Sequence, residues 1–62
     1  SPMQYLNKTR IEKAKELLLY SDETVGTIGQ LVGIENSNSF IRLFREKTGV
    51  TPLTYRRETP GL

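Results

Sequence analysis

Proline and glycine divide this chain into four segments, and the apolar residues within each segment recur at the spacing of a helix. The first segment is the longest and opens with Pro2, which suits the first helical position because no N–H donor is needed there. Ser1 and Gln4 can add a capping box. We expect one helix from Pro2 to about Tyr20. Its apolar face consists of Leu6, Ile11, Ala14, Leu17 and Leu18.

A shorter second helix is expected over residues 24–32. Thr24 can cap its start, and Gly33 follows it as a left-handed C-cap. Gly26 and Gly29 each weaken this helix by about 1 kcal/mol relative to alanine. Gly29 nevertheless leaves room for another helix to approach closely.

Two further helices complete the pattern. The third, over residues 36–48, carries an apolar stripe and ends at Gly49. The fourth begins at Thr51-Pro52, and we expect its Leu53 and Tyr55 to point inward. The stripe on the third helix consists of Phe40, Leu43 and Phe44. Because no segment alternates like a strand, the sequence predicts an all-α fold: a small homeodomain-like bundle with one long N-terminal helix, three short helices and a helix-turn-helix.

Length and composition exclude several classes of function. A chain of 62 residues supports a thin core and not a ligand-sized cavity. With no cysteine and no histidine, no paired carboxylates beside a plausible pocket and no phosphate-binding glycine loop, we expect no enzyme, no metal and no cofactor. The longest apolar run, residues 17–20, is too short to span a membrane, and no signal peptide is visible, so we expect a cytoplasmic protein.

Positive charge is concentrated in the second half of the chain. Residues 36–57 have a net charge of +4 with Glu46 as their only acidic residue, whereas residues 1–35 have −1 and the whole chain +2. The basic residues of this block are Arg42, Arg45, Lys47, Arg56 and Arg57. Such a block favours a surface that faces a polyanion. On charge alone, an ordinary solvated face explains it equally well.

The third helix also carries side chains suited to the edges of bases. Arginine can bond guanine at two atoms, asparagine can bond adenine and serine either base, while Ile41 could contact a thymine methyl group. We expect base contacts in the major groove of double-stranded DNA from Ser37, Asn38, Ile41 and Arg42. Simpler interpretations compete with these. Asn36 is preferred as a helix cap, Ser37 is balanced between capping and base contact, and Arg42 could pair with Glu46.

Phosphate contacts are expected where the third helix ends and the fourth begins. The Thr51 hydroxyl, the N–H groups after Pro52 and the positive helix terminus together suit an anion. An ordinary capped helix explains the same residues. The predicted phosphate contacts are Arg45, Lys47, Thr51 and Arg56.

The segment LVGIENSNSFIRLFREKTGVTPLTYRR, residues 31–57, resembles the signature of the AraC/XylS family of bacterial transcription regulators. The preceding RIEKAKELL, residues 10–18, resembles the long helix that links the two helix-turn-helix units of this family. The chain departs from the family at Gly26 and Gly29, where alanine is common, and at Ile34, where an aromatic residue is usual. The residues that carry the match are Gly33, Phe40, Phe44, Arg45, Gly49, Thr51, Pro52, Tyr55 and Arg56.

This resemblance implies sequence-specific binding of double-stranded DNA in transcription regulation, with RNA polymerase as a further partner of the full-length protein. It also accounts for the similar segments SPMQY (residues 1–5) and TPLTY (residues 51–55), because each unit of this family ends in such a segment. We therefore expect residues 1–20 to be the linker helix, starting with the tail of a first unit that is not in this chain. Residues 21–57 would form the second helix-turn-helix unit, and residues 58–62 a flexible tail.

A small helical protein-interaction or dimerisation module is the alternative function. The glycine-interrupted second helix and an incomplete domain favour exposed apolar surface, through which copies of the fragment could self-associate. Low salt sensitivity and no retention on duplex DNA would favour this alternative.

Overall fold

The computed structural model describes residues 2–59 and the side chains from residue 6 onward. The predicted capping box of Ser1 and Gln4 and the end of the predicted tail, residues 60–62, lie outside the described residues. Within the described part all regular structure is helical, as predicted, and no helix is long and apolar enough to cross a lipid bilayer. The elements are α1 (Pro2–Tyr20), α2 (Val25–Leu31), α3 (Ser37–Thr48) and α4 (Pro52–Glu58). Glu58, predicted to begin the tail, is the last residue of α4.

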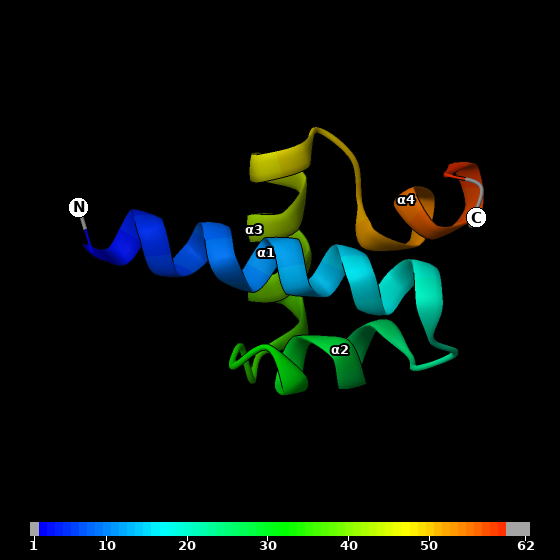
Figure 1. The fold of residues 1–62 in the computed structure, drawn as a ribbon, viewed down its shortest axis with the longest axis horizontal. Coiled ribbons are helices and arrows are strands. Elements are labelled where there is room, and N and C mark those ends of the chain that lie inside the picture. The colour runs from blue at the N-terminus through cyan, green and yellow to red at the C-terminus, as the bar shows by residue number, and fades with distance from the viewer. Residues whose placement is uncertain (1, 60–62) are drawn as a thin grey trace.

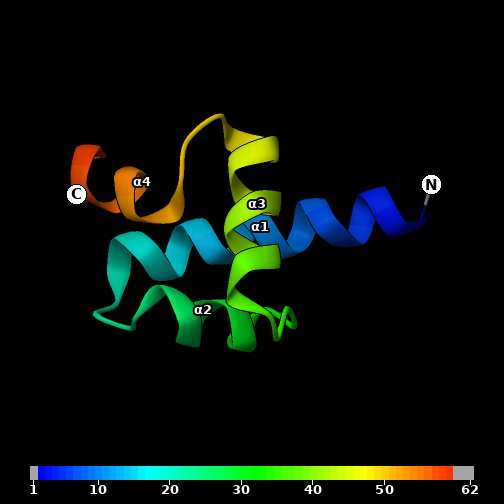
Figure 2. The same ribbon diagram turned by 180° about the vertical axis from the view of Figure 1, so that it is seen from behind.

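The helices cross in a way that leaves one side of α3 uncovered. Figure 1 shows α1 running across the front of α3, with α2 below α1 and α4 beside the C-terminal half of α3. In the view from behind, α3 lies in front of α1 and no other helix covers it (Figure 2). The fold therefore uses one side of α3 for packing and presents the other side outward.

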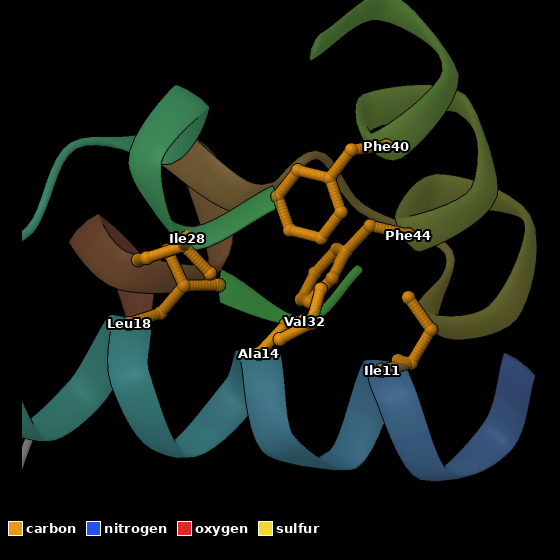
Figure 3. Packing of buried hydrophobic residues seen from close by; sticks show 7 residues of the cluster. All are labelled: Ile11, Ala14, Leu18, Ile28, Val32, Phe40 and Phe44. Atoms are coloured by element: carbon orange, nitrogen blue, oxygen red, sulfur yellow. The ribbon is translucent and has the colours of Figure 1, made fainter. Parts of the chain in front are cut away.

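The core lies where α1, α2 and α3 meet. The Phe40 and Phe44 rings, both fully buried, lie 6.0 Å apart in an edge-to-face arrangement, and Phe44 meets Tyr55 of α4 in the same way at 5.5 Å. Each aromatic pair contributes about 0.5–1.5 kcal/mol beyond the area that it buries. The buried apolar side chains, drawn in Figure 3, are Ile11, Ala14, Leu18, Ile28, Val32, Phe40 and Phe44.

The turn between α2 and α3 depends on two glycines. Gly33 has a φ of 94°, the left-handed conformation predicted for it, and its N–H donates to the Gln30 carbonyl at 3.1 Å. Gly29 lies where α2 meets the first turn of α3. A Cβ atom there would lie 3.1 Å from both the Ile34 carbonyl oxygen and the Phe40 Cγ. The predicted close approach at Gly29 is therefore confirmed.

Two leucines assigned to the core by their spacing are exposed. Leu53 is 53% exposed, which corrects the expectation that it points inward. The reason is that Pro52 is buried and Tyr55, three residues later, contacts Phe44, so Leu53 lies about 100° away from the face that they share. Leu6 is 41% exposed because α1 extends beyond its crossing with α3 (Figure 1).

Candidate nucleic-acid interface

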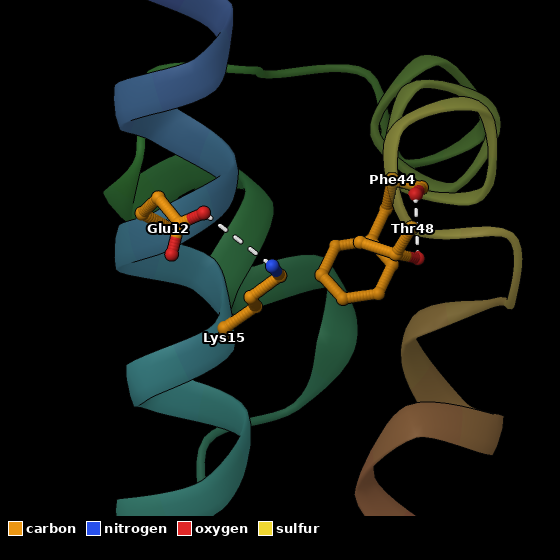
Figure 4. Close-up of polar contacts among 4 residues, drawn as sticks. All are labelled: Glu12, Lys15, Phe44 and Thr48. Carbon is orange, nitrogen blue, oxygen red and sulfur yellow. Dashed lines mark hydrogen bonds and ion pairs between the residues drawn. The ribbon is translucent and has the colours of Figure 1, made fainter.

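Helix α3 is fixed in place along its whole length. Phe40 and Phe44 anchor its inner side, and Leu43 packs against the same core. At its end, the Thr48 hydroxyl donates to the Phe44 carbonyl at 2.8 Å (Figure 4), and Gly49 ends the helix with a φ of 88°. A helix held in this way can present its outer side chains in a constant orientation.

Asn36 caps the start of α3, as the sequence predicted. Its side-chain oxygen accepts a hydrogen bond from the backbone N–H of Ser39 at 3.1 Å. Ser37 is therefore not the cap of α3, and its side chain is exposed with no hydrogen bond to another described residue. Both Ser37 and Asn38 are therefore free to face a ligand at the first turn of α3.

The outer face of α3 forms one side of an open hollow of about 620 Å³. Among the residues that line it, Asn38, Arg42 and Arg45 are exposed and Ile41 is half-buried. The hollow is lined by Asn38, Ile41, Arg42, Arg45, Glu46 and Thr51. The structure thus brings together five of the eight residues that the sequence assigned to DNA contacts. Glu46 also lines the hollow and is not one of the predicted DNA contacts, although its position four residues after Arg42 indicates the same face of α3.

Neither arginine in this hollow has an ion-pair partner among the described side chains. Among the described side chains, the ion pairs are Lys13–Glu16 and Lys15–Glu12, both on α1. Arg42 was expected to have a competing partner in Glu46, and no such pair forms between these two described residues. The guanidinium donors of Arg42 and Arg45 are consequently available to acceptors outside the chain.

Thr51 lies at the edge of the hollow, but its hydroxyl is used within the protein. It accepts from the Thr54 N–H at 3.3 Å and donates to the Thr54 hydroxyl at 2.9 Å, which caps α4. The capping interpretation of Thr51 is therefore confirmed, because its hydroxyl oxygen accepts the bond from the Thr54 N–H.

The other two predicted phosphate contacts lie elsewhere. Lys47 lines a separate groove with residues of α1. The half-buried Arg56 donates from Nε to the Leu18 carbonyl at 2.9 Å and from Nη2 to the Ser21 carbonyl at 3.0 Å. Where the sequence predicted a phosphate contact, the structure therefore directs two Arg56 donors to the end of α1. The absence of any basic residue in the last turn of α1 could have signalled that its carbonyl groups need a donor from another element.

A three-dimensional arrangement of two short helices joined by a glycine turn, with the second helix presenting unpaired polar groups, defines a helix-turn-helix DNA-binding domain. Comparison with known proteins gives the family. The profile of a helix-turn-helix domain family matches residues 1–58, so the chain belongs to this family, which is of the AraC type. Domains of this family bind DNA in a sequence-specific manner in transcription regulation.

Individual relatives agree with this assignment. The chain is 45% identical over 53 residues to the HTH-type transcriptional activator RhaR of Pectobacterium carotovorum, covering 86% of this chain and 19% of that protein. It is 38% identical over 55 residues to the bifunctional transcriptional activator/DNA repair enzyme AdaA of Bacillus subtilis, covering 89% of this chain and 26% of that protein. The chain thus spans about a quarter or less of the length of these relatives.

A solved structure is similar over most of the chain. The C-terminal domain of the two-component response regulator yesN from Fusobacterium nucleatum superposes with a TM-score of 0.86 at 41% identity. The match covers 87% of this chain and 52% of that domain.

Proposed function

We propose that this chain reads double-stranded DNA by placing α3 in the major groove. The observation that carries the proposal is the outer face of α3, whose polar side chains are exposed and have no partner within the described part of the chain. Arg42 is suited to guanine, Asn38 to adenine, and Ser37 to either base, while Ile41 is suited to a thymine methyl group. Arg45, on the next turn, would bind a phosphate and fix the register of α3 on the duplex.

The other predicted phosphate contacts contribute less in this arrangement. The backbone around Thr51 lies beside the hollow and would approach the DNA strand next to Arg45, although its hydroxyl already caps α4. Lys47 and Arg56 are left out of the interface because the first lines a groove against α1 and the second bonds to the end of α1. The proposed interface is consequently small, and one such unit would bind weakly.

In the complete protein, a second unit would supply the missing affinity. Residues 1–20 would then link the two units, and residues 21–57 would form the second of them. The similarity of residues 1–5 to residues 51–55 and the match to about half of the yesN C-terminal domain support this arrangement. Two such helices on one face of DNA are about one turn, or roughly 34 Å, apart. The whole protein would regulate transcription in the cytoplasm together with RNA polymerase. Copies of the fragment could associate through exposed apolar residues such as Leu31 and Leu53.

The test is selection of preferred duplexes from a random pool by the wild-type chain and by Asn38→Ala, Arg42→Ala and Lys13→Ala variants. Arg42→Ala should lower the affinity for the preferred duplex by about 1–3 kcal/mol and remove the preference at one base position. Lys13, exposed on α1 and paired with Glu16, is the matched control for loss of one positive charge. If Arg42→Ala and Lys13→Ala leave the same site preference, α3 does not read bases through Arg42.

A further inference from the structure

A second basic surface lies between α1 and the C-terminal turn of α3. It is a groove of about 520 Å³ lined by Lys8, Ile11, Glu12, Lys15 and Lys47. Three ammonium groups meet one carboxylate here, so the groove carries a formal charge of +2. The DNA-binding face described above uses none of these residues.

The charges of this groove are only partly neutralised within the chain. Lys15 contacts Glu12 at 3.4 Å and extends toward α3, as Figure 4 shows; its side chain is 31% exposed, whereas that of Glu12 is 59% exposed. Lys8 and Lys47 are exposed and have no hydrogen bond or ion pair to another described residue. Of the residues that line the groove, only Ile11 belongs to the buried core, so core packing does not explain why three lysines lie together here.

The groove faces away from the surface proposed to bind DNA. Lys47 follows Arg42 by five residues, which places it about 140° around the axis of α3. Figures 1 and 2 show that α1 crosses one side of α3 and leaves the other side uncovered. The groove is lined by residues of both α1 and α3, whereas the hollow around Arg42 contains no residue of α1. A molecule in the groove would therefore leave the outer face of α3 accessible to a duplex.

We infer that this groove binds an acidic segment of another protein while the outer face of α3 is occupied by DNA. Lys8 and Lys15 are seven residues apart, about 10 Å along one face of α1, and Lys47 lies across from them. Carboxylates spaced along a peptide can reach all three ammonium groups, and the lysine side-chain methylenes can contact an apolar residue between those carboxylates. The acidic residues of a peptide can be spaced so that none lies opposite Glu12, whereas a nucleic acid strand carries a phosphate at every nucleotide.

The experiment measures binding of a short fluorescent peptide, rich in glutamate with interspersed leucines, by anisotropy at low salt. The Lys8→Gln/Lys47→Gln double variant should bind this peptide roughly tenfold more weakly than the wild-type chain. The matched control is the Lys13→Gln/Arg57→Gln double variant, which loses the same charge from exposed positions outside the groove. Circular dichroism verifies that all variants keep the helical fold. An equal loss of affinity in both double variants would mean that the peptide responds only to net charge, which overturns the inference.

Two further measurements separate the groove from the DNA-binding face. Peptide affinity should be unchanged when the chain is first saturated with its preferred duplex, and displacement of the peptide by the duplex would overturn the inference. The affinity of Lys47→Gln for the duplex, and its salt dependence, should equal those of the wild-type chain. A weaker and less salt-dependent complex would show that Lys47 binds DNA phosphate, which would assign the groove to nucleic acid.

Discussion

Replacing Arg56 by alanine should destabilise the fold without weakening DNA binding. Arg56 makes two charge-assisted hydrogen bonds, to the carbonyl oxygens of Leu18 and Ser21, and these join α4 to the end of α1 across 38 and 35 residues of sequence. Hydrogen bonds to a charged group contribute about 1.5–3 kcal/mol each. Because Arg56 is only half-buried, water can replace part of this loss, and we expect a decrease of about 2 kcal/mol in the free energy of unfolding.

The assay is thermal unfolding followed by circular dichroism, with duplex binding measured where all variants are folded. For a domain of this size, a decrease of about 2 kcal/mol lowers Tm by about 8–16 °C. Arg56→Lys should fall between the wild type and Arg56→Ala, because an ammonium group cannot reproduce the fork of two donors. Arg57→Ala, at the exposed neighbouring position, should change stability by no more than about 0.5 kcal/mol. An unchanged Tm for Arg56→Ala together with a weaker, less salt-dependent DNA complex would refute this reasoning and restore the predicted phosphate contact.

Three further predictions follow from the same geometry. Gly26→Ala should raise the free energy of unfolding by about 0.5–1 kcal/mol, measured by chemical denaturation. Gly29→Ala should raise it by less, because the new methyl group would press on Phe40 and on the Ile34 carbonyl oxygen. Gly49→Ala should cost about 1–2 kcal/mol in the same measurement, since the φ of 88° disfavours any Cβ even though no atom lies within 4 Å of it. The logarithm of the duplex-binding constant should fall with the logarithm of salt concentration with a slope of about −1, for the phosphate contact of Arg45, and not the slope of about −3 expected if Lys47 and Arg56 also bound phosphate.

Local signals in the sequence were sufficient for the helices and their ends. Thr24, Asn36 and Thr51 cap the helices that follow them, and Gly33 and Gly49 adopt the left-handed conformation that the turns require. These features depend on contacts within about four residues, which sequence patterns report directly.

The direction in which a side chain points was harder to predict than the positions of the helices. Leu53 shows why the buried face of a short helix is difficult to predict. In the seven residues of α4, either Pro52 or its neighbour Leu53 could face the core, and the structure buries Pro52. Arg56 shows the limit for polar residues. Its partners are Leu18, in the last turn of α1, and Ser21, just after α1, and nothing in the residues adjacent to Arg56 identifies them.

The basic residues of the segment 36–57 therefore lie on different surfaces, and the net charge of +4 does not reveal this. Arg42 and Arg45 face the hollow together with Glu46, Lys47 faces α1, and Arg56 bonds to the end of α1. The position of Lys47 was readable from the sequence, because it follows Phe40 by seven residues and Phe44 by three and so shares their side of the helix. With one acid opposing two arginines, electrostatic attraction to DNA is modest. In the proposed complex, discrimination among sequences would depend on the outward-facing groups of α3, and affinity on a second contact with the same duplex.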